Sequence, residues 1–216
     1  MDYGNMVGEA FGYAKEGLVG KWMKWILLLI ATILLTLPLM GYSLKILRGE
    51  KPSPEVEGWG TLFIDGIKYL IICLIYAIPV FIILAVTMAP VLAAAMTGDS
   101  NAVMAGLGGF LLGLVLLVIV AIIIGLFEFI GIVRFARTGS MGEAFNFSAI
   151  LATIGKIGWV NYILALIIMG IILVIIETIC SLIPVVGMLL LFILMPFLTI
   201  FQARYTCMVY DSAGSA

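Results

Sequence analysis

Apolar residues in this chain come in five long blocks that polar stretches separate. The blocks are Trp25 to Leu47, Ile67 to Met96, Val103 to Val133, Trp159 to Ile176 and Leu182 to Phe201. Each approaches or exceeds the ~20 residues that a helix needs to cross the ~30 Å hydrocarbon core of a bilayer. The pattern therefore predicts membrane helices, and the charges between the blocks decide how many of them cross.

Composition supports the same class of protein. Of the 216 residues, 64% are hydrophobic and 11% are charged, whereas a soluble domain is about half apolar and about a quarter charged. The net charge is -1, so no nucleic acid partner is expected. We expect an all-α fold, a polytopic membrane helical bundle whose main partner is the lipid bilayer.

The eleven Lys and Arg residues gather in some connectors and are absent from others. They lie before the first block, between or at the edges of the first and second, between the third and fourth, and after the fifth. The connectors Thr97 to Ala102 and Glu177 to Ser181 have none. Because Lys and Arg near membrane segments stay in the cytoplasm, we predict that these two connectors are external and that both termini are cytoplasmic, in the cell membrane.

The first block conflicts with a single crossing, because positive charge flanks both of its ends. The conflict disappears if the block enters and leaves the membrane on the same side. Its middle reads TLPLMGYS, where Pro38 removes a backbone donor and Gly41 permits a turn. We predict a re-entrant helical hairpin over residues 25-47, turning at Pro38 and Gly41, and about four full spans after it. The alternative is one span with a kink at Pro38.

The tetrapeptide GEAF occurs at Gly8 to Phe11 and again at Gly142 to Phe145. Each copy precedes a Gly-Lys pair, a tryptophan and an apolar run that contains a proline and a glycine, which are Pro184 and Gly187 in the second copy. We interpret this as one unit used twice. Interfacial amphipathic helices are expected ahead of the apolar runs, with headgroup contacts from Lys21, Lys68 and Lys156.

This organisation predicts a single membrane domain over residues 1-216, with three parts. Residues 8-50 form an interfacial helix and a short hairpin, residues 58-137 form a central helix pair, and residues 142-210 form an interfacial helix and a spanning hairpin.

Three stretches of the chain, LPLMGYSLKILRG, GWGTLFIDGIKYL and GEAFNFSAI, resemble a prokaryotic, mostly archaeal membrane family known as domain of unknown function 4013. The resemblance covers most of the chain, and GWGTLFIDGIKYL is its most specific part. It implies a polytopic membrane protein. It brings no established activity, cofactor or site residue to this sequence.

The sequence offers few groups for catalysis. It has no histidine, which removes His-based zinc sites and Ser-His pairs. Cys73, Cys180 and Cys207 are isolated and are expected to be buried small hydrophobes rather than disulfide or metal ligands. We expect no enzyme, no metal and no cofactor.

Two features remain as candidate functional positions. Gly109 and Gly113 have the GxxxG spacing that lets another helix approach closely, either within the protein or between copies. Glu128 is the only acidic residue inside an apolar block. A charge at mid-bilayer costs ~2.5 to 3.5 kcal/mol, so Glu128 is expected to have a partner among Lys68, Arg204 and Asn161. It either fixes helix register or relays a proton or cation.

The predicted hairpin and interfacial helices would occupy more of the inner leaflet than of the outer one. This asymmetry favours a non-catalytic membrane scaffold or lipid-organising module, with copies of itself or other membrane proteins as further partners. The alternative is a small solute or ion transporter or channel subunit that uses Glu128.

Overall fold

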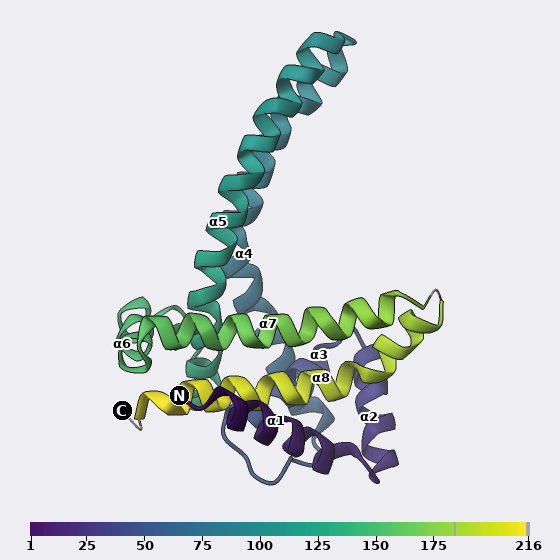
Figure 1. Cartoon of the computed structure of the whole chain (residues 1–216), viewed down its shortest axis with the longest axis vertical. Helices are drawn as coiled ribbons and strands as arrows, with labels where there is room; N and C mark the ends of the chain where they lie inside the picture. Colours follow the sequence, from purple (N-terminus) through teal and green to yellow (C-terminus); the bar gives the residue numbers. More distant parts are fainter. Residues whose placement is uncertain (184, 215–216) are drawn as a thin grey trace. The chain divides into compact units, whose positions relative to one another are not determined.

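The computed structural model describes residues 1–183 and 185–214, and these are helical with no strand among them (Figure 1). Pro184 lies outside the described residues. The elements in chain order are α1 (Tyr3–Leu18), α2 (Trp22–Ile33), α3 (Leu37–Leu47), α4 (Trp59–Thr97), α5 (Ser100–Thr138), the 3-10 helix η1 (Met141–Phe145), α6 (Phe147–Ile157), α7 (Trp159–Ser181), α8 (Val186–Asp211) and η2 (Ser212–Gly214).

Four of the described helices are long and apolar enough to cross a membrane, namely α4, α5, α7 and α8. The prediction of an all-α membrane bundle is thereby confirmed. The chain divides into two compact units. The larger contains Met1–Leu70 and Ile130–Ala216, and the smaller contains Ile71–Phe129.

The smaller unit is a helical hairpin in which α4 and α5 run side by side (Figure 1). The helix α4 continues without a break to Thr97 and contains Pro79 and Pro90. A Cβ atom at Gly113 would lie 2.1 Å from Thr87 Cγ2, and one at Gly106 would lie 3.2 Å from Val91 Cα. These two glycines, seven residues apart, therefore allow the two helices to approach each other. A Cβ atom at Gly109 would meet nothing within 4 Å, so a packing role for Gly109 stays a prediction.

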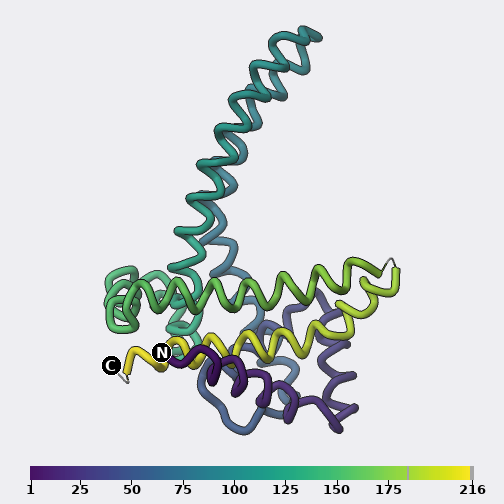
Figure 2. Tube along the Cα trace, viewed as in Figure 1, coloured from purple at the N-terminus to yellow at the C-terminus, as the bar shows by residue number. Residues whose placement is uncertain are grey.

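In the larger unit, α8 contacts α1, α2, α3 and α7. The beginning of α1 lies beside the carboxyl end of α8 (Figure 2), where Ser212 Oγ is 3.8 Å from Met1 Sδ. Tyr205 of α8 is fully buried and donates a hydrogen bond to the Ala165 carbonyl of α7 at 3.1 Å. The core of this unit is thus built around one helix, α8.

The first apolar block forms two short helices, α2 and α3, joined by a turn at residues 34–36. Leu35 and Thr36 adopt left-handed φ values of 56° and 59°. The predicted turn at Pro38 and Gly41 is therefore wrong. Pro38 lies in the first turn of α3, where a helix needs no backbone N–H from it and where its fixed φ suits the helix.

Gly41 has a packing role instead of a turning role. A Cβ atom there would lie 2.0 Å from the Leu62 carbonyl oxygen, and a Cβ atom at Gly66 would lie 1.9 Å from the Leu37 carbonyl oxygen. The backbones of α3 and the start of α4 therefore touch at two points, and each point needs a glycine. A Cβ atom at either glycine would overlap backbone atoms of the other helix, and these cannot rotate away as a side chain can. A side chain at either position therefore forces the two helices apart.

Replacing Gly41 or Gly66 with alanine should destabilise the larger unit by about 3 kcal/mol, at the upper end of the usual cost of overpacking. Thermal unfolding in detergent measures this. Gly60→Ala is the matched control, because Gly60 lies in the same helix α4 and a Cβ there meets nothing within 4 Å. An equal loss of stability in all three variants would contradict the close approach.

Candidate functional site

A polar network lies in the larger unit, around the loop that joins α3 to α4. Its centre is Ser53, which is 7% exposed. Lys24 Nζ donates to the Ser53 carbonyl oxygen at 3.1 Å and lies 3.2 Å from Ser53 Oγ. The Tyr42 hydroxyl is 2.9 Å from Ser53 Oγ and donates to the Pro54 carbonyl oxygen at 2.7 Å. One loop serine thus joins α2 to α3.

Lys24 is a cation on the buried face of an apolar helix. It shares that face with Leu28, Ala31 and Thr32, and its side chain is only 3% exposed. An ammonium group has three N–H donors. Ser53 supplies two acceptors, and Glu55 Oε1 lies 3.7 Å away. Burial nevertheless lowers the pKa of Lys24, because it disfavours the charged form more than Glu55 favours it.

A second ion cluster joins α1 to α8 and to the same loop. Arg204 of α8 is 3% exposed, and its Nη2 donates to Glu9 Oε1 at 2.5 Å. Lys51 Nζ donates to the same oxygen at 2.8 Å. These hydrogen bonds, from Lys51 first and then from Arg204, lower the pKa of Glu9. The Arg204 guanidinium also lies 5.2 Å from the centre of the Tyr13 ring.

Burial raises the pKa of Tyr13 to about 12, so its hydroxyl stays protonated near neutral pH and donates to the Glu50 carbonyl oxygen at 2.8 Å. Arg137, at the end of α5, extends the network. Its Nε donates to the Leu47 carbonyl oxygen at 2.7 Å, and its Nη2 donates to Asp211 at 2.8 Å. Cations thus hold the ends of α1, α2, α3, α5 and α8 together within the larger unit.

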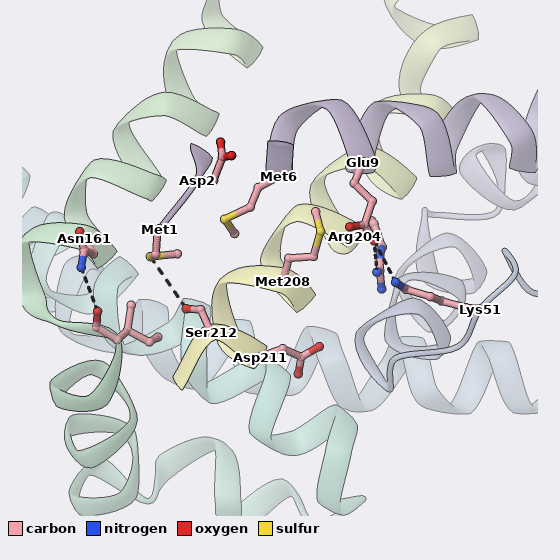
Figure 3. A pocket seen from close by; sticks show the side chains of 11 residues that line it. Met1, Asp2, Met6, Glu9, Lys51, Asn161, Arg204, Met208, Asp211 and Ser212 are labelled. Atoms are coloured by element: carbon pink, nitrogen blue, oxygen red, sulfur yellow. Dashed lines mark hydrogen bonds and ion pairs between the residues drawn. The ribbon is translucent and has the colours of Figure 1, made fainter. Parts of the chain in front are cut away.

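A cavity of about 590 Å³ lies beside the Arg204 cluster (Figure 3). Its lining includes Glu9, Lys51 and Arg204 on one wall, and the thioethers of Met6 and Met208. Arg204 Nε is buried and has no hydrogen-bond partner. Among the described residues, no group of three or more His, Cys, Asp or Glu side chains could hold a metal ion.

Glu128 lies in the smaller unit, whereas its three expected partners lie in the larger one. Its side chain is hydrogen-bonded to Cys73 in the smaller unit. Lys68 lies 3.8 Å from Asp65, Arg204 pairs with Glu9, and Asn161 Oδ1 accepts from the Tyr3 hydroxyl at 3.0 Å. Contact of Glu128 with one of these three residues therefore stays a prediction, and within the smaller unit a thiol on the neighbouring helix supplies its hydrogen bond.

The three lysines that were expected to contact lipid headgroups differ from one another in their neighbours. Lys21 lies 4.0 Å from Glu55, and Lys68 is near Asp65. Lys156 is exposed at the end of α6 and makes no ion pair with a described residue. Headgroup contact by these three lysines stays a prediction.

Sequence reasoning did not predict that Lys24 would contact Ser53, or that Glu9 would contact Lys51. No local sequence pattern connects Glu9 with its partner Arg204, because the two residues are 195 positions apart along the chain. One hint was present: Arg204 follows an apolar run directly, and a buried guanidinium requires an anion or an aromatic ring.

Replacing Glu9 with glutamine should lower stability by about 1 kcal/mol near neutral pH, since Glu9 is partly exposed and its ion pairs are screened. The pKa of Glu9 is lower in the folded chain than its ordinary 4.5. Its stabilisation is therefore fully present above about pH 4.5 and is lost as the pH falls through the lowered value.

Unfolding in detergent across this pH range checks the prediction, with Glu16→Gln on the exposed side of α1 as the control. Hydrogen bonding from Arg134 also lowers the pKa of Glu143, so only the difference between wild type and Glu9→Gln isolates Glu9. A difference that does not shrink as the pH falls would contradict the prediction.

Residues 25–185 match a family described as "Protein of unknown function (DUF4013)". No curated protein and no solved structure matches the chain. The family match begins at α2 and extends through the α7 helix, so it includes Ser53 and the α4–α5 hairpin. Because it covers more than half of the chain, this protein belongs to the DUF4013 family.

Proposed function

We propose that this protein is a non-catalytic membrane scaffold or lipid-organising module that occupies more of the inner leaflet than of the outer one. The observation that carries the proposal is the hydrogen bond from Lys24 Nζ to the Ser53 carbonyl oxygen, at 3.1 Å. Lys24 lies at the start of the first apolar block and Ser53 follows its end. A single crossing would separate the two ends by ~30 Å of hydrocarbon.

The length of α2 supports re-entry as well. Its 12 residues rise about 18 Å, which is little more than half of a bilayer core. Its outward face is apolar, with Trp22, Met23 and Ile33 each about two-thirds exposed. Leu35, in the turn, is 80% exposed. Lipid is the medium that suits such a face, and a helix of this length does not carry the turn across to the far interface.

The second element on this side is α6. Phe147 and Leu151 are exposed on one face, whereas Ile150 and Ile154 are buried on the other. Lys156 and Trp159 lie at its carboxyl end. An exposed apolar face with an aromatic and a lysine at its edge is typical of a helix lying in the interface. Together, α2, α3 and α6 add volume to one leaflet only, which favours curvature.

Orientation follows from the same network. The Met1 and Ser212 side chains meet, which suits an even number of crossings and both termini on one side. The buried cations Lys24 and Arg204 and the exposed, paired Lys51 cluster in that region. The positive-inside rule therefore favours a cytoplasmic location for the network and for both termini in the cell membrane.

Reconstitution into liposomes tests the scaffold. Wild-type protein should shift vesicles to smaller diameters as the protein-to-lipid ratio rises, measured by light scattering and electron microscopy. A variant with Ile26→Ser and Ile30→Ser on the exposed face of α2 should lose much of this effect, because less apolar surface enters the leaflet.

The matched control carries Ile171→Ser and Ile175→Ser, at similarly exposed positions of the spanning helix α7. It should deform vesicles as wild type does. Unchanged vesicle size with wild-type protein, or an equal loss in both variants, would count against the scaffold.

One observation favours a second candidate function. Glu128 lies within the apolar α5 helix, forms no ion pair among the described residues, and is hydrogen-bonded to an uncharged thiol. A carboxylate held this way in a spanning segment suits a proton or cation relay in a transporter or channel subunit.

Glu128→Gln separates the two functions. A relay predicts loss of proton or cation flux into protein-containing liposomes, whereas a scaffold predicts the same vesicle shape and no flux in either protein. Glu177→Gln, at the end of α7, serves as the control. A flux that Glu128→Gln leaves intact would reject the relay.

A further inference from the structure

We propose that the cavity beside Arg204 binds a phosphate-type anion, with the phosphodiester of an anionic lipid headgroup as one source and soluble phosphate as the other. The lipid source rests on the proposed function, because it requires this part of the larger unit to lie at the membrane surface. The site itself rests on the geometry of Arg204 and Lys51 (Figure 3).

The first observation is an excess of donors on a buried guanidinium. Arg204 is 3% exposed and has five N–H donors. Only Nη2 reaches an oxygen, on Glu9. Nη1 has a 4.0 Å contact with Cys207 Sγ, and Nε has no partner. Buried donors are nearly always satisfied, so this guanidinium has spare donor capacity beside the cavity.

The second observation is the local charge. Arg204 and Lys51 carry two positive charges, and both donate to the same oxygen of Glu9. Asp211 also lines the cavity but is paired with Arg137. The carboxylate of Asp2, at the far side, accepts from the Asn5 backbone N–H. One positive charge at the Arg204 wall is therefore unmatched, and a monoanion with several oxygens would match it.

The third observation concerns the size and the other wall of the cavity. A volume of about 590 Å³ exceeds the needs of a phosphate ion and lies within the range of small-molecule pockets. Met6, Met208 and Ile157 provide an apolar surface, and methionine adapts to irregular apolar ligands. A headgroup with the first part of its attached chain uses both walls, so this shape favours the lipid source.

Binding to the purified full-length protein in detergent tests the site, with phosphatidylglycerol, phosphatidylcholine and inorganic phosphate as separate probes. The rise in unfolding temperature gives the apparent affinity for each. Wild type should bind phosphatidylglycerol in preference to phosphatidylcholine. Lys51→Gln should weaken this binding about fivefold, since one cation near a membrane surface contributes about 1 kcal/mol.

Glu9→Gln should act in the opposite direction and strengthen binding severalfold, because it removes the anion that competes for Arg204 and Lys51. Diffuse surface charge would shift binding in the same two directions, so a further control is needed to separate a site from surface charge. Lys15→Gln is the matched control, because Lys15 is exposed on α1 and does not line the cavity. It should bind as wild type does.

Three results would overturn the proposal. Equal losses in Lys51→Gln and Lys15→Gln would assign the binding to diffuse surface charge. Binding that Glu9→Gln leaves unchanged would show that Arg204 and Lys51 do not hold the anion. Binding of inorganic phosphate alone would reject the lipid source. Because vesicle deformation depends on Ile26 and Ile30 and not on Lys51, failure here is distinguishable from failure of the scaffold.

Discussion

The buried ammonium of Lys24 holds together the two ends of the first apolar block, and much of the larger unit depends on this contact. The loop that follows α3 is fixed where Lys24 and Tyr42 meet Ser53. Since a buried cation without acceptors is costly, α2 can keep its place only while that loop supplies them. A short helix with exposed isoleucines thereby stays beside a polar loop.

The buried cations specify the arrangement of helices that apolar packing alone would leave open. Hydrophobic contacts do not drive association between helices in lipid, because acyl chains are as apolar as leucine. Close approach at Gly41 and Gly66 and charge-assisted bonds such as Arg204 to Glu9 supply position and register instead. Arg204 keeps spare donors after it pairs with Glu9, and these donors form one wall of the proposed anion site.

Much of the fold could be predicted from sequence because block length and charge act locally. Four long apolar helices and a broken first block followed from those two properties. The turn was misplaced, because Pro38 is compatible with the first turn of a helix and Gly41 is needed by a backbone 21 residues further along the chain, at Leu62. The contact of Glu128 with Cys73 was not predicted, for a similar reason. Such contacts depend on tertiary approach, which no local pattern encodes.

The proposed re-entry of the first apolar block is tested most directly by labelling single introduced cysteines in intact cells with a membrane-impermeant thiol reagent. Suitable positions are Glu16 before the block, Glu57 after it and Ser100 at the tip of the α4–α5 hairpin, all exposed, in a background lacking the three native cysteines. Re-entry predicts labelling at Ser100 in intact cells, and at Glu16 and Glu57 only after permeabilisation. Labelling of Glu57 together with Ser100, with Glu16 still protected, would contradict it and make the first block a span.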